Sequence, residues 1–219
     1  MSSISHLIDG WKQEQLTRAA KVKIQPLAPL PRMVAGVDCA FSADKKSIFC
    51  VALVYDRLEQ RVIEIVRERQ AVTVPYVPGY LSFREGPAVL AAIRKLKQPF
   101  GVICFDGQGM AHPRRCGLAT HIGVELDLPS VGMAKSRLIG EFDPPATEAG
   151  SVSPLTDKGD TIGSVLRTRA GVSPIFLSVG HRIDLASARD LALACITRYR
   201  IPEPTRQADR EVAKSKLMA

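Results

Sequence analysis

Two acidic residues that lie in or directly after apolar segments are the first candidates for chemistry. Asp38 lies within the apolar run 33–41, and Asp106 ends the apolar run 100–106. If these runs are neighbouring strands, about 4.8 Å apart, their two carboxylates can share one cation. Hard divalent cations such as Mg²⁺ take oxygen ligands of this kind. Either acid alone could simply cap a turn, and Asp106-Gly107 is a typical turn dipeptide. Asp38 and Asp106 together, on strands expected to be neighbours, favour a metal site.

Two further acids are weaker candidates. Glu85 precedes a segment with helical periodicity, so it could complete an acidic centre or could simply favour the positive end of the helix dipole. Asp209 lies in a basic C-terminal segment, where a solvated helix residue is the plain alternative.

Cationic side chains follow the acids along the chain. His112, Arg114 and Arg115 come soon after Asp106, and Lys135 follows another short apolar run. Arginines at the start of a helix, beside free amide N–H groups, can hold backbone phosphates. Lys135 would emerge at the same edge of the sheet, either to contact phosphate or as a solvated strand end. His112 could orient a water or a phosphate, or serve only as a hydrogen-bonded structural residue.

The segment VPYVPGYL, residues 74–81, combines an aromatic side chain with a stiff backbone. Pro75 and Pro78 flank Tyr76 and Val77, and prolines reduce the entropy that is lost when a loop is held fixed. A rigid aromatic wedge suits stacking against a base or filling the gap that a flipped base leaves. A plain turn with Tyr76 packed inward is the alternative.

The hydrophobic pattern predicts the elements that position these residues. Apolar runs at 33–41, 47–56 and 61–70, joined by short polar connections, predict an antiparallel meander. Right-handed crossovers then place a strand over 100–106 beside the first strand, with a further strand at 129–134. This order predicts an α/β, ribonuclease-H-like fold: a mixed sheet of three antiparallel and two parallel strands, flanked by helices. The remaining expectations are a helix at about 5–22, a loop at 74–87, helices at 88–96 and from Pro113 to about 124, a surface excursion at 141–160, a hairpin of 161–169 with 174–180, and helices at 184–200 and 202–216.

Composition places the chain in a broad class. Its 219 residues predict one domain, 1–219, and 46% hydrophobic with 24% charged residues is typical of a soluble protein. No apolar run is long enough to span a membrane and the N-terminus has no secretory pattern, so we expect a cytoplasmic protein without a membrane partner. An odd number of cysteines without a C-x-x-C pair predicts reduced thiols, with a catalytic cysteine as a remote alternative. The five are Cys39, Cys50, Cys104, Cys116 and Cys195.

The charge indicates the class of partner. The formal net charge is +8 and the pI is about 9.4, which favours a polyanion such as nucleic acid over a neutral ligand. The C-terminal tail, about 198–219, adds to this, because its residues 198–216 carry six cations and three acids.

With these residues in place, the chain resembles the endonuclease V family of deoxyinosine-specific nucleases. The resemblance extends from MVAGVDCAFS, beginning at residue 33, to RIPEPTRQAD, ending at residue 209. Its most specific blocks are VPYVPGYLSFREGP, FDGQGMAHPRRCGLATHIG, PSVGMAKSRL and SVGHRI.

The resemblance implies roles for individual residues. It implies Mg²⁺, or Mn²⁺ in its place, held by Asp38, Asp106 and Glu85. Lys135 and His112 would assist catalysis, and Tyr76 would separate the DNA strands. The other implied contacts are Pro75, Val77, Pro78, Arg84, Arg114 and Arg115 for nucleic acid and Gly79, Leu81, Gly107 and Gly109 for the flipped base, while the roles of Asp209 and His181 stay open.

The implied reaction is hydrolysis of the second phosphodiester bond 3′ to a deaminated base in DNA, leaving 3′-hydroxyl and 5′-phosphate ends. One alternative is the same chemistry on inosine-containing RNA. A second is a non-catalytic binder of damaged nucleic acid, although clustered carboxylates do not help to bind a polyanion. A partner-binding scaffold would not require cations around those acids. We expect the protein to act as a monomer.

Overall fold

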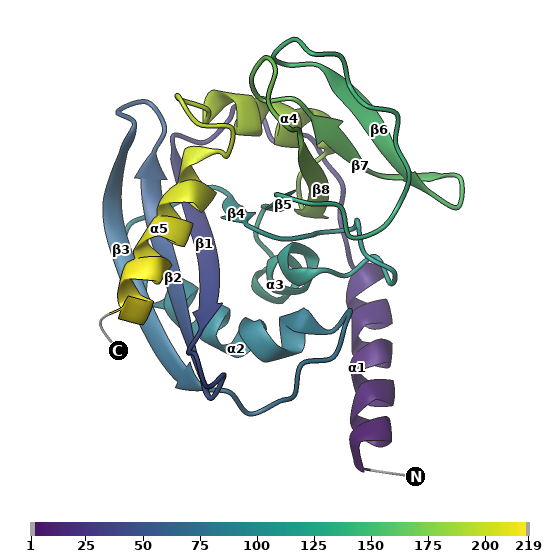
Figure 1. Ribbon diagram of the computed structural model, residues 1–219, viewed down its shortest axis with the longest axis vertical. Helices are drawn as coiled ribbons and strands as arrows, with labels where there is room; N and C mark the ends of the chain where they lie inside the picture. Colours follow the sequence, from purple (N-terminus) through teal and green to yellow (C-terminus); the bar gives the residue numbers. More distant parts are fainter. Residues whose placement is uncertain (1–2, 218–219) are drawn as a thin grey trace.

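A single eight-stranded mixed sheet organises the molecule, and helices cover both of its faces (Figure 1). The structure, a computed structural model, describes residues 3–217. The strand order is β3-β2-β1-β4-β5-β8-β7-β6. The strands are β1 (Met33–Phe41), β2 (Ser47–Asp56), β3 (Arg61–Ala71), β4 (Ile103–Phe105), β5 (Ser130–Ala134), β6 (Val152–Asp157), β7 (Asp160–Leu166) and β8 (Ile175–His181). The helices are α1 (Ser3–Ala19), α2 (Leu81–Arg94), α3 (Leu118–Leu126), α4 (Leu185–Ala194) and α5 (Glu203–Leu217).

The first five strands confirm the predicted sheet. β1, β2 and β3 form an antiparallel meander, β4 pairs in parallel with β1, and β5 pairs in parallel with β4. The last β1–β4 pair is Val37 with Phe105. Asp38 and Asp106 are therefore the next residues on two adjacent, parallel strands.

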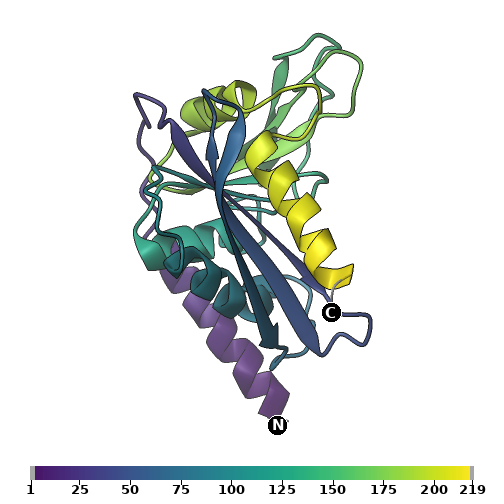
Figure 2. The same cartoon turned by 90° about the vertical axis from the view of Figure 1, so that its left-hand side faces the viewer.

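Strand alternation explains how the sheet is buried on both faces. Along β2, Ile48, Cys50 and Ala52 belong to the core beneath α2 and α3. The intervening side chains Phe49 and Val51 belong to the core beneath α5. Successive residues of a strand point to opposite faces, so a strand that is covered on both sides reads as one continuous apolar run. Figure 2 shows α5 on one side of the long strands and α2 on the other.

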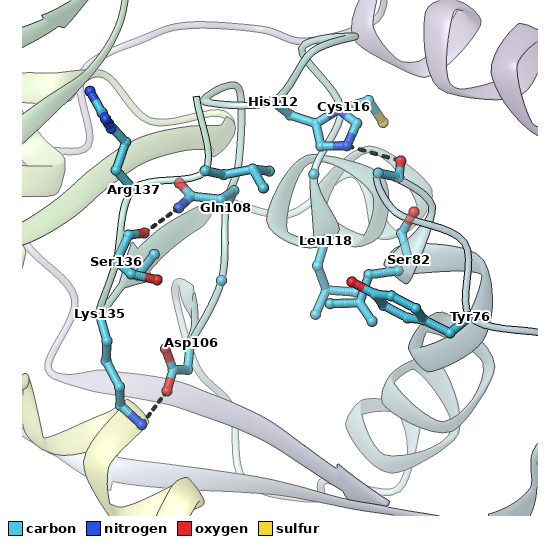
Figure 3. A pocket seen from close by; sticks show the side chains of 16 residues that line it. Tyr76, Ser82, Asp106, Gln108, His112, Cys116, Leu118, Lys135, Ser136 and Arg137 are labelled. Atoms are coloured by element: carbon cyan, nitrogen blue, oxygen red, sulfur yellow. Dashed lines mark hydrogen bonds and ion pairs between the residues drawn. The ribbon is translucent and has the colours of Figure 1, made fainter. Parts of the chain in front are cut away.

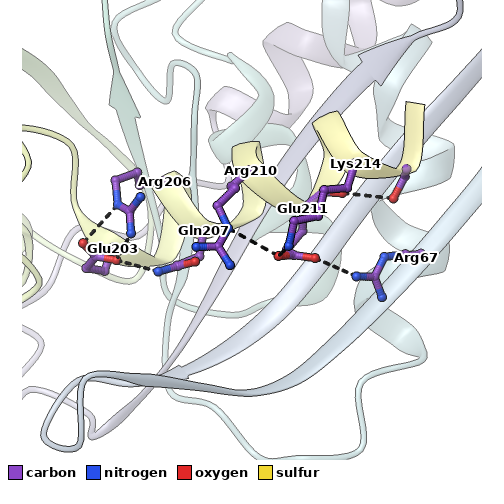
Figure 4. Close-up of polar contacts among 8 residues, drawn as sticks. Arg67, Glu203, Arg206, Gln207, Arg210, Glu211 and Lys214 are labelled. Carbon is purple, nitrogen blue, oxygen red and sulfur yellow. Dashed lines mark hydrogen bonds and ion pairs between the residues drawn. The ribbon is translucent and has the colours of Figure 1, made fainter. Parts of the chain in front are cut away.

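Helix α5 is held against the sheet by apolar packing and by its own ion pairs. Its Ala208 and Val212 are buried against β2. Glu203 pairs with Arg206 at 2.7 Å, and Glu211 pairs with Arg67 of β3 at 2.7 Å (Figure 4). Arg206, Arg210 and Lys214 of the basic tail thus pair with acids of α5 itself, and the tail is an ordered helix rather than a free basic arm.

Three strands extend the sheet beyond the five that were predicted. β8 pairs with β5, and the predicted late hairpin is confirmed as β7 with β8. β6 was missed, because 141–160 reads as a loop and contains Pro154. Pro154 is tolerated because β6 is the edge strand of the sheet. Lys158 and Gly159 both adopt positive φ in the tight turn to β7, as such hairpins require.

Helix boundaries also differ from those expected. The loop predicted over 74–87 is wrong in its second half, since α2 begins at Leu81 and contains Pro87. Proline inside a helix removes one backbone hydrogen bond, and in α2 Val89 and Ala92, which follow Pro87, are buried against the sheet and stabilise the helix by packing. Glu85 therefore lies within the helix rather than before it.

The segment after Pro113 is a turn and not the start of a helix. Arg115 has φ of 55°, a left-handed conformation that cannot continue a helix, and α3 begins only at Leu118. The N-terminal helix covers Ser3–Ala19 rather than 5–22, and α4 ends at Ala194 rather than near 200. All five cysteines are free thiols. Between residues 3 and 217, no helix has both the length and the apolar character needed to cross a membrane.

Candidate active site

The acidic centre forms where β4 and β5 end, beside Asp38 within β1. In open α/β sheets, sites form beyond the carboxyl ends of strands, and these three strands bring Asp38, Asp106 and Lys135 to the same edge. Lys135 directly follows β5. Its Nζ lies 2.6 Å from Asp106 Oδ2 and 3.1 Å from Asp209 Oδ2 (Figure 3 shows the first contact). Asp209, whose role was open, is thus part of the cluster and arrives on α5.

Lys135 is held as a cation by this arrangement. Burial alone would lower the pKa of Lys135, but its hydrogen bonds and charge attraction to Asp106 and Asp209 raise that pKa. The ammonium group is therefore protonated at neutral pH, and it neutralises two of the four acids.

Asp38 and Glu85 are left without a comparable cation. Burial, and then the charge of Asp106, raise the pKa of Asp38 to about 7. Burial, and then the charge of Asp38, raise the pKa of Glu85 to about 8. Like charges near a desolvated carboxylate disfavour its ionised form, so the centre would be stabilised by a further positive charge.

The donor chemistry fits a hard divalent cation. Asp38, Asp106 and Glu85 offer carboxylate oxygens, the ligands that Mg²⁺ takes, and the ionised forms of Asp38 and Glu85 are destabilised by burial and by the charge of a neighbouring acid. In the described range 3–217, however, no three Asp, Glu, His or Cys side chains form a ready-made group for a metal ion. The three carboxylates could hold the cation, while Lys135 engages Asp106 in this structure.

The acidic centre should lower the stability of the metal-free protein. The pKa of Asp38 is about 7 in the fold against 3.8 normally, so the fold penalises the ionised form. The penalty is absent below 3.8, grows as pH rises, and is complete above about 7. Full ionisation costs on the order of 4 kcal/mol. We expect Asp38→Asn in EDTA to raise Tm by about 5 °C or more at pH 8, measured by calorimetry.

At pH 4 that gain should nearly disappear, and added Mg²⁺ should narrow the difference at pH 8 by stabilising the unaltered protein. Asp190→Asn, which changes an exposed acid of α4, is the matched control and should not change Tm. A gain that is equal at pH 4 and pH 8 would show that Asp38 carries no such electrostatic penalty.

A cavity of about 390 Å³ adjoins the acidic centre, and Asp106 and Lys135 form part of its wall (Figure 3). Three of the four residues expected around a flipped base, Gly79, Leu81 and Gly107, line it, whereas Gly109 does not. A Cβ on Gly109 would lie 2.1 Å from the carbonyl oxygen of Val179, so Gly109 allows close backbone packing behind the cavity. The other lining residues are Tyr76, Ser82, Gln108, His112, Cys116, Gly117, Leu118, Ala134, Ser136, Arg137 and Leu138.

Exposed apolar side chains stand at this cavity. Tyr76 is 64% exposed, which contradicts the alternative in which it packs inward, and Pro75 and Pro78 beside it are also exposed. Val77 is half-buried. Leu138, also exposed, was not singled out from the sequence, although it lies only three residues beyond Lys135.

The comparisons with known proteins identify the family of the chain. A family model described as Endonuclease V matches residues 16–210, which contain all the acids named above. An endonuclease V of Roseiflexus sp. (strain RS-1) is 49% identical over 178 residues, covering 81% of this chain and 79% of the relative. The chain belongs to the endonuclease V family.

Solved structures of the family share the fold. Endonuclease V from Streptomyces avermitilis matches with a TM-score of 0.91 at 40% identity, covering 96% of this chain and 94% of that one. Ciona intestinalis endonuclease V, crystallised with a 24mer DNA containing an inosine followed by a ribo-adenosine, matches with a TM-score of 0.84 at 25% identity, covering 97% and 99%. The ribonuclease-H-like fold predicted from the sequence is confirmed, and membership of the family identifies a nuclease.

In this chain, the basic side chains that follow Asp106 have structural partners. His112 Nε2 lies 3.0 Å from the carbonyl oxygen of Gly79, and its Nδ1 accepts a hydrogen bond from the backbone N–H of Arg114 at 3.2 Å. Burial, and then the charge of Arg114, lower the pKa of His112 to about 4, so the ring is neutral and donates through Nε2. Both ring nitrogens are thereby engaged in holding loops together.

Arg115 and Arg84 lie in different surroundings. Arg115 pairs with Asp157 at 2.8 Å and so fixes the loop after Asp106 to the β6–β7 hairpin. Arg84, next to Glu85, stacks its guanidinium 4.4 Å from the centroid of the Phe41 ring, and its buried Nε has no hydrogen-bond partner in the structure. Arg84 is therefore the better placed of the two to receive a new acceptor.

His181 is not brought to the acidic centre. It pairs with Ser130, at the beginning of β5, whereas Lys135 follows the end of that strand. Its Nε2 lies 2.9 Å from Asp127 Oδ1, and its Nδ1 accepts from the backbone N–H of Lys23 at 3.3 Å. His181 fastens the segment after α1 to the end of α3.

Proposed function

We propose that this chain cleaves DNA at deoxyinosine, hydrolysing the second phosphodiester bond 3′ to the deaminated base. The observation that supports this most directly is that Asp106 and Lys135 belong to the acidic centre and also line the cavity. A base held in the cavity would keep a neighbouring phosphate near the acids. The family relative from Ciona intestinalis, bound to inosine-containing DNA, supports the choice of substrate.

The cavity suits a single base. Its volume of about 390 Å³ lies within the usual range for small-molecule sites, and Gly79 and Gly107 allow the backbone to approach a planar ligand closely. Extruding a base from a duplex requires unstacking, which an exposed aromatic side chain can offset by filling the gap. Tyr76 supplies such a side chain at the cavity.

The charged groups would then act on the phosphate. Lys135 would hold the phosphate by charge, in exchange for part of its contact with the acids. Asp38, Asp106 and Glu85 would hold Mg²⁺, which when bound would supply positive charge to the attacking water and the leaving oxygen. Arg84 would contact the DNA backbone. We infer that Arg114 and Arg115 support the site mainly by fixing loops, since both are already engaged.

A nicking assay tests the proposal. An end-labelled duplex with one deoxyinosine should be cut one nucleotide 3′ of the inosine in Mg²⁺ and not in EDTA, and the same duplex with adenosine should stay intact. Polymerase extension and direct ligation should verify the 3′-hydroxyl and 5′-phosphate ends. Release of the base, or cleavage elsewhere, would contradict the proposed reaction. A matched RNA strand with inosine tests the ribonuclease alternative, which preferential cleavage of RNA would favour.

A further inference from the structure

Helix α1 buries a glutamine while neighbouring leucines face solvent. Gln15 is 1% exposed, whereas Leu16 is 44% and Leu7 is 40% exposed. Leu7, Ile8, Trp11 and Leu16 recur at helical spacing, yet among these only Trp11 is buried. An amide is costly to bury unless its hydrogen bonds are satisfied, so this inversion calls for specific partners.

Gln15 finds those partners in two loops that form the cavity. Its Nε2 donates to the carbonyl oxygen of Gly79 at 3.1 Å and to that of Cys116 at 3.2 Å. Its Oε1 accepts from Nε of Arg114. Both donors and the acceptor of the amide are therefore in use, and one side chain joins α1 to the loop of Tyr76 and to the loop after Asp106.

The Gly79 carbonyl is the point at which these contacts meet. It also accepts from Arg114 Nη2 at 2.5 Å and from His112 Nε2 at 3.0 Å (Figure 3 shows the histidine contact). Gly79 has φ of 78°, so its orientation depends on a conformation that other residues rarely adopt. Tyr76 lies three residues earlier. We call residues 74–80 the Tyr76 loop. Its exposed residue Tyr76 is thus held in place through the contacts of Gly79.

Aromatic packing from α1 also holds the C-terminal end of the Tyr76 loop. Trp11, one helical turn before Gln15, stacks on Phe83 with ring centroids 5.0 Å apart and lies 5.8 Å from Tyr80. The guanidinium of Arg114 covers the other aromatic neighbour, 4.0 Å from the Tyr80 ring centroid. The aromatic contacts fix where α2 begins, while Gln15 fixes how the Gly79 peptide is turned.

We propose that Gln15 is a positioning residue that sets the Tyr76 loop against the cavity, so that Tyr76 enters a duplex at the place where the base is captured. This inference rests on the proposed cleavage at deoxyinosine. On duplex DNA the loop has to separate the strands, but on a single strand it does not. Gln15 therefore matters for the duplex substrate far more than for the single strand.

The test compares Gln15→Met with Gln13→Met. Methionine keeps the length of the side chain and removes its hydrogen bonds, and Gln13 is an exposed glutamine on the same helix. Single-turnover nicking is measured on inosine DNA as a duplex and as a single strand. We expect Gln15→Met to lower the duplex-to-single-strand rate ratio about tenfold, in keeping with the loss of a buried hydrogen-bond set. Gln13→Met should leave the ratio unchanged, and Tyr76→Ala should lower it as Gln15→Met does.

A second measurement does not depend on cleavage. Amide hydrogen exchange of the DNA-free protein should be faster in residues 74–80 of Gln15→Met, and unaltered in Gln13→Met. Equal losses on duplex and single strand would show that Gln15 only stabilises the fold, and would overturn the inference. Unchanged exchange in the Tyr76 loop would overturn it as well. If the unaltered protein cuts neither substrate, the proposed function fails, whereas the exchange result still decides whether Gln15 positions the loop.

Discussion

Asp106→Asn should reduce nicking at deoxyinosine by on the order of 10³-fold, because losing one preorganised charge at a reacting centre typically has that effect. The substitution removes the carboxylate that holds Lys135 Nζ at 2.6 Å and that lies next to Asp38 across two adjacent strands. It would weaken the hold on the cation and on the lysine at once. The cavity wall keeps its shape, since asparagine has nearly the same size.

Binding should survive this change. Single-turnover cleavage and fluorescence anisotropy in EDTA, both on the same inosine duplex, separate the two effects. We expect the Kd for Asp106→Asn to stay within a few-fold of the unaltered value, or to improve, because a negative charge near phosphate is removed. Asp190→Asn is again the matched control and should cleave normally. Nicking by Asp106→Asn at a near-normal rate would rule out the acidic centre as the place of the reaction.

Gly36→Ala should destabilise the protein by about 3 kcal/mol or more, as severe overpacking does. Gly36 lies on β1, two residues before Asp38 and on the same side of the strand. A Cβ there would lie 2.1 Å from the carbonyl oxygen of Pro204 in α5, and because that neighbour is backbone, no side-chain rotation relieves the clash. The helix would have to move away from the sheet, and Asp209 with it.

Urea unfolding with matched activity measurements tests this expectation. Gly10→Ala in α1 is the control, since a Cβ there meets nothing within 4 Å, and it should raise helix stability by up to about 1 kcal/mol. Gly36→Ala should also reduce cleavage under conditions where it remains folded. Asp209 Oδ2 lies 3.1 Å from Lys135 Nζ, so a shift of α5 would lengthen this contact beyond hydrogen-bond distance. Full stability in Gly36→Ala would mean that α5 can sit further from β1 than the structure shows.

The centre of the sheet and the adjacency of its two principal acids follow from local sequence patterns. The runs 33–41, 47–56 and 100–106 are long or strongly apolar, and the handedness of crossovers leaves few ways to order them. Asp38 and Asp106 then become neighbours through strand register alone. β6 could have been found as well, from the tight turn at Lys158 and Gly159, but Pro154 and the polar composition around it obscured the alternation.

Which polar side chains come into contact depends on how the elements pack in the folded chain. Lys135 and Asp209 are 74 residues apart in sequence, and Gln15 and Arg114 are 99 apart. Such contacts depend on how α5 and α1 dock, which local periodicity does not encode. The same holds for Arg115. The sequence predicts that it binds phosphate, but in the fold it pairs with Asp157 of β6. Hydrophobic patterns specify the faces that elements bury, whereas hydrogen bonds and ion pairs need atoms within about 3 Å, and only the packed chain fixes positions that closely.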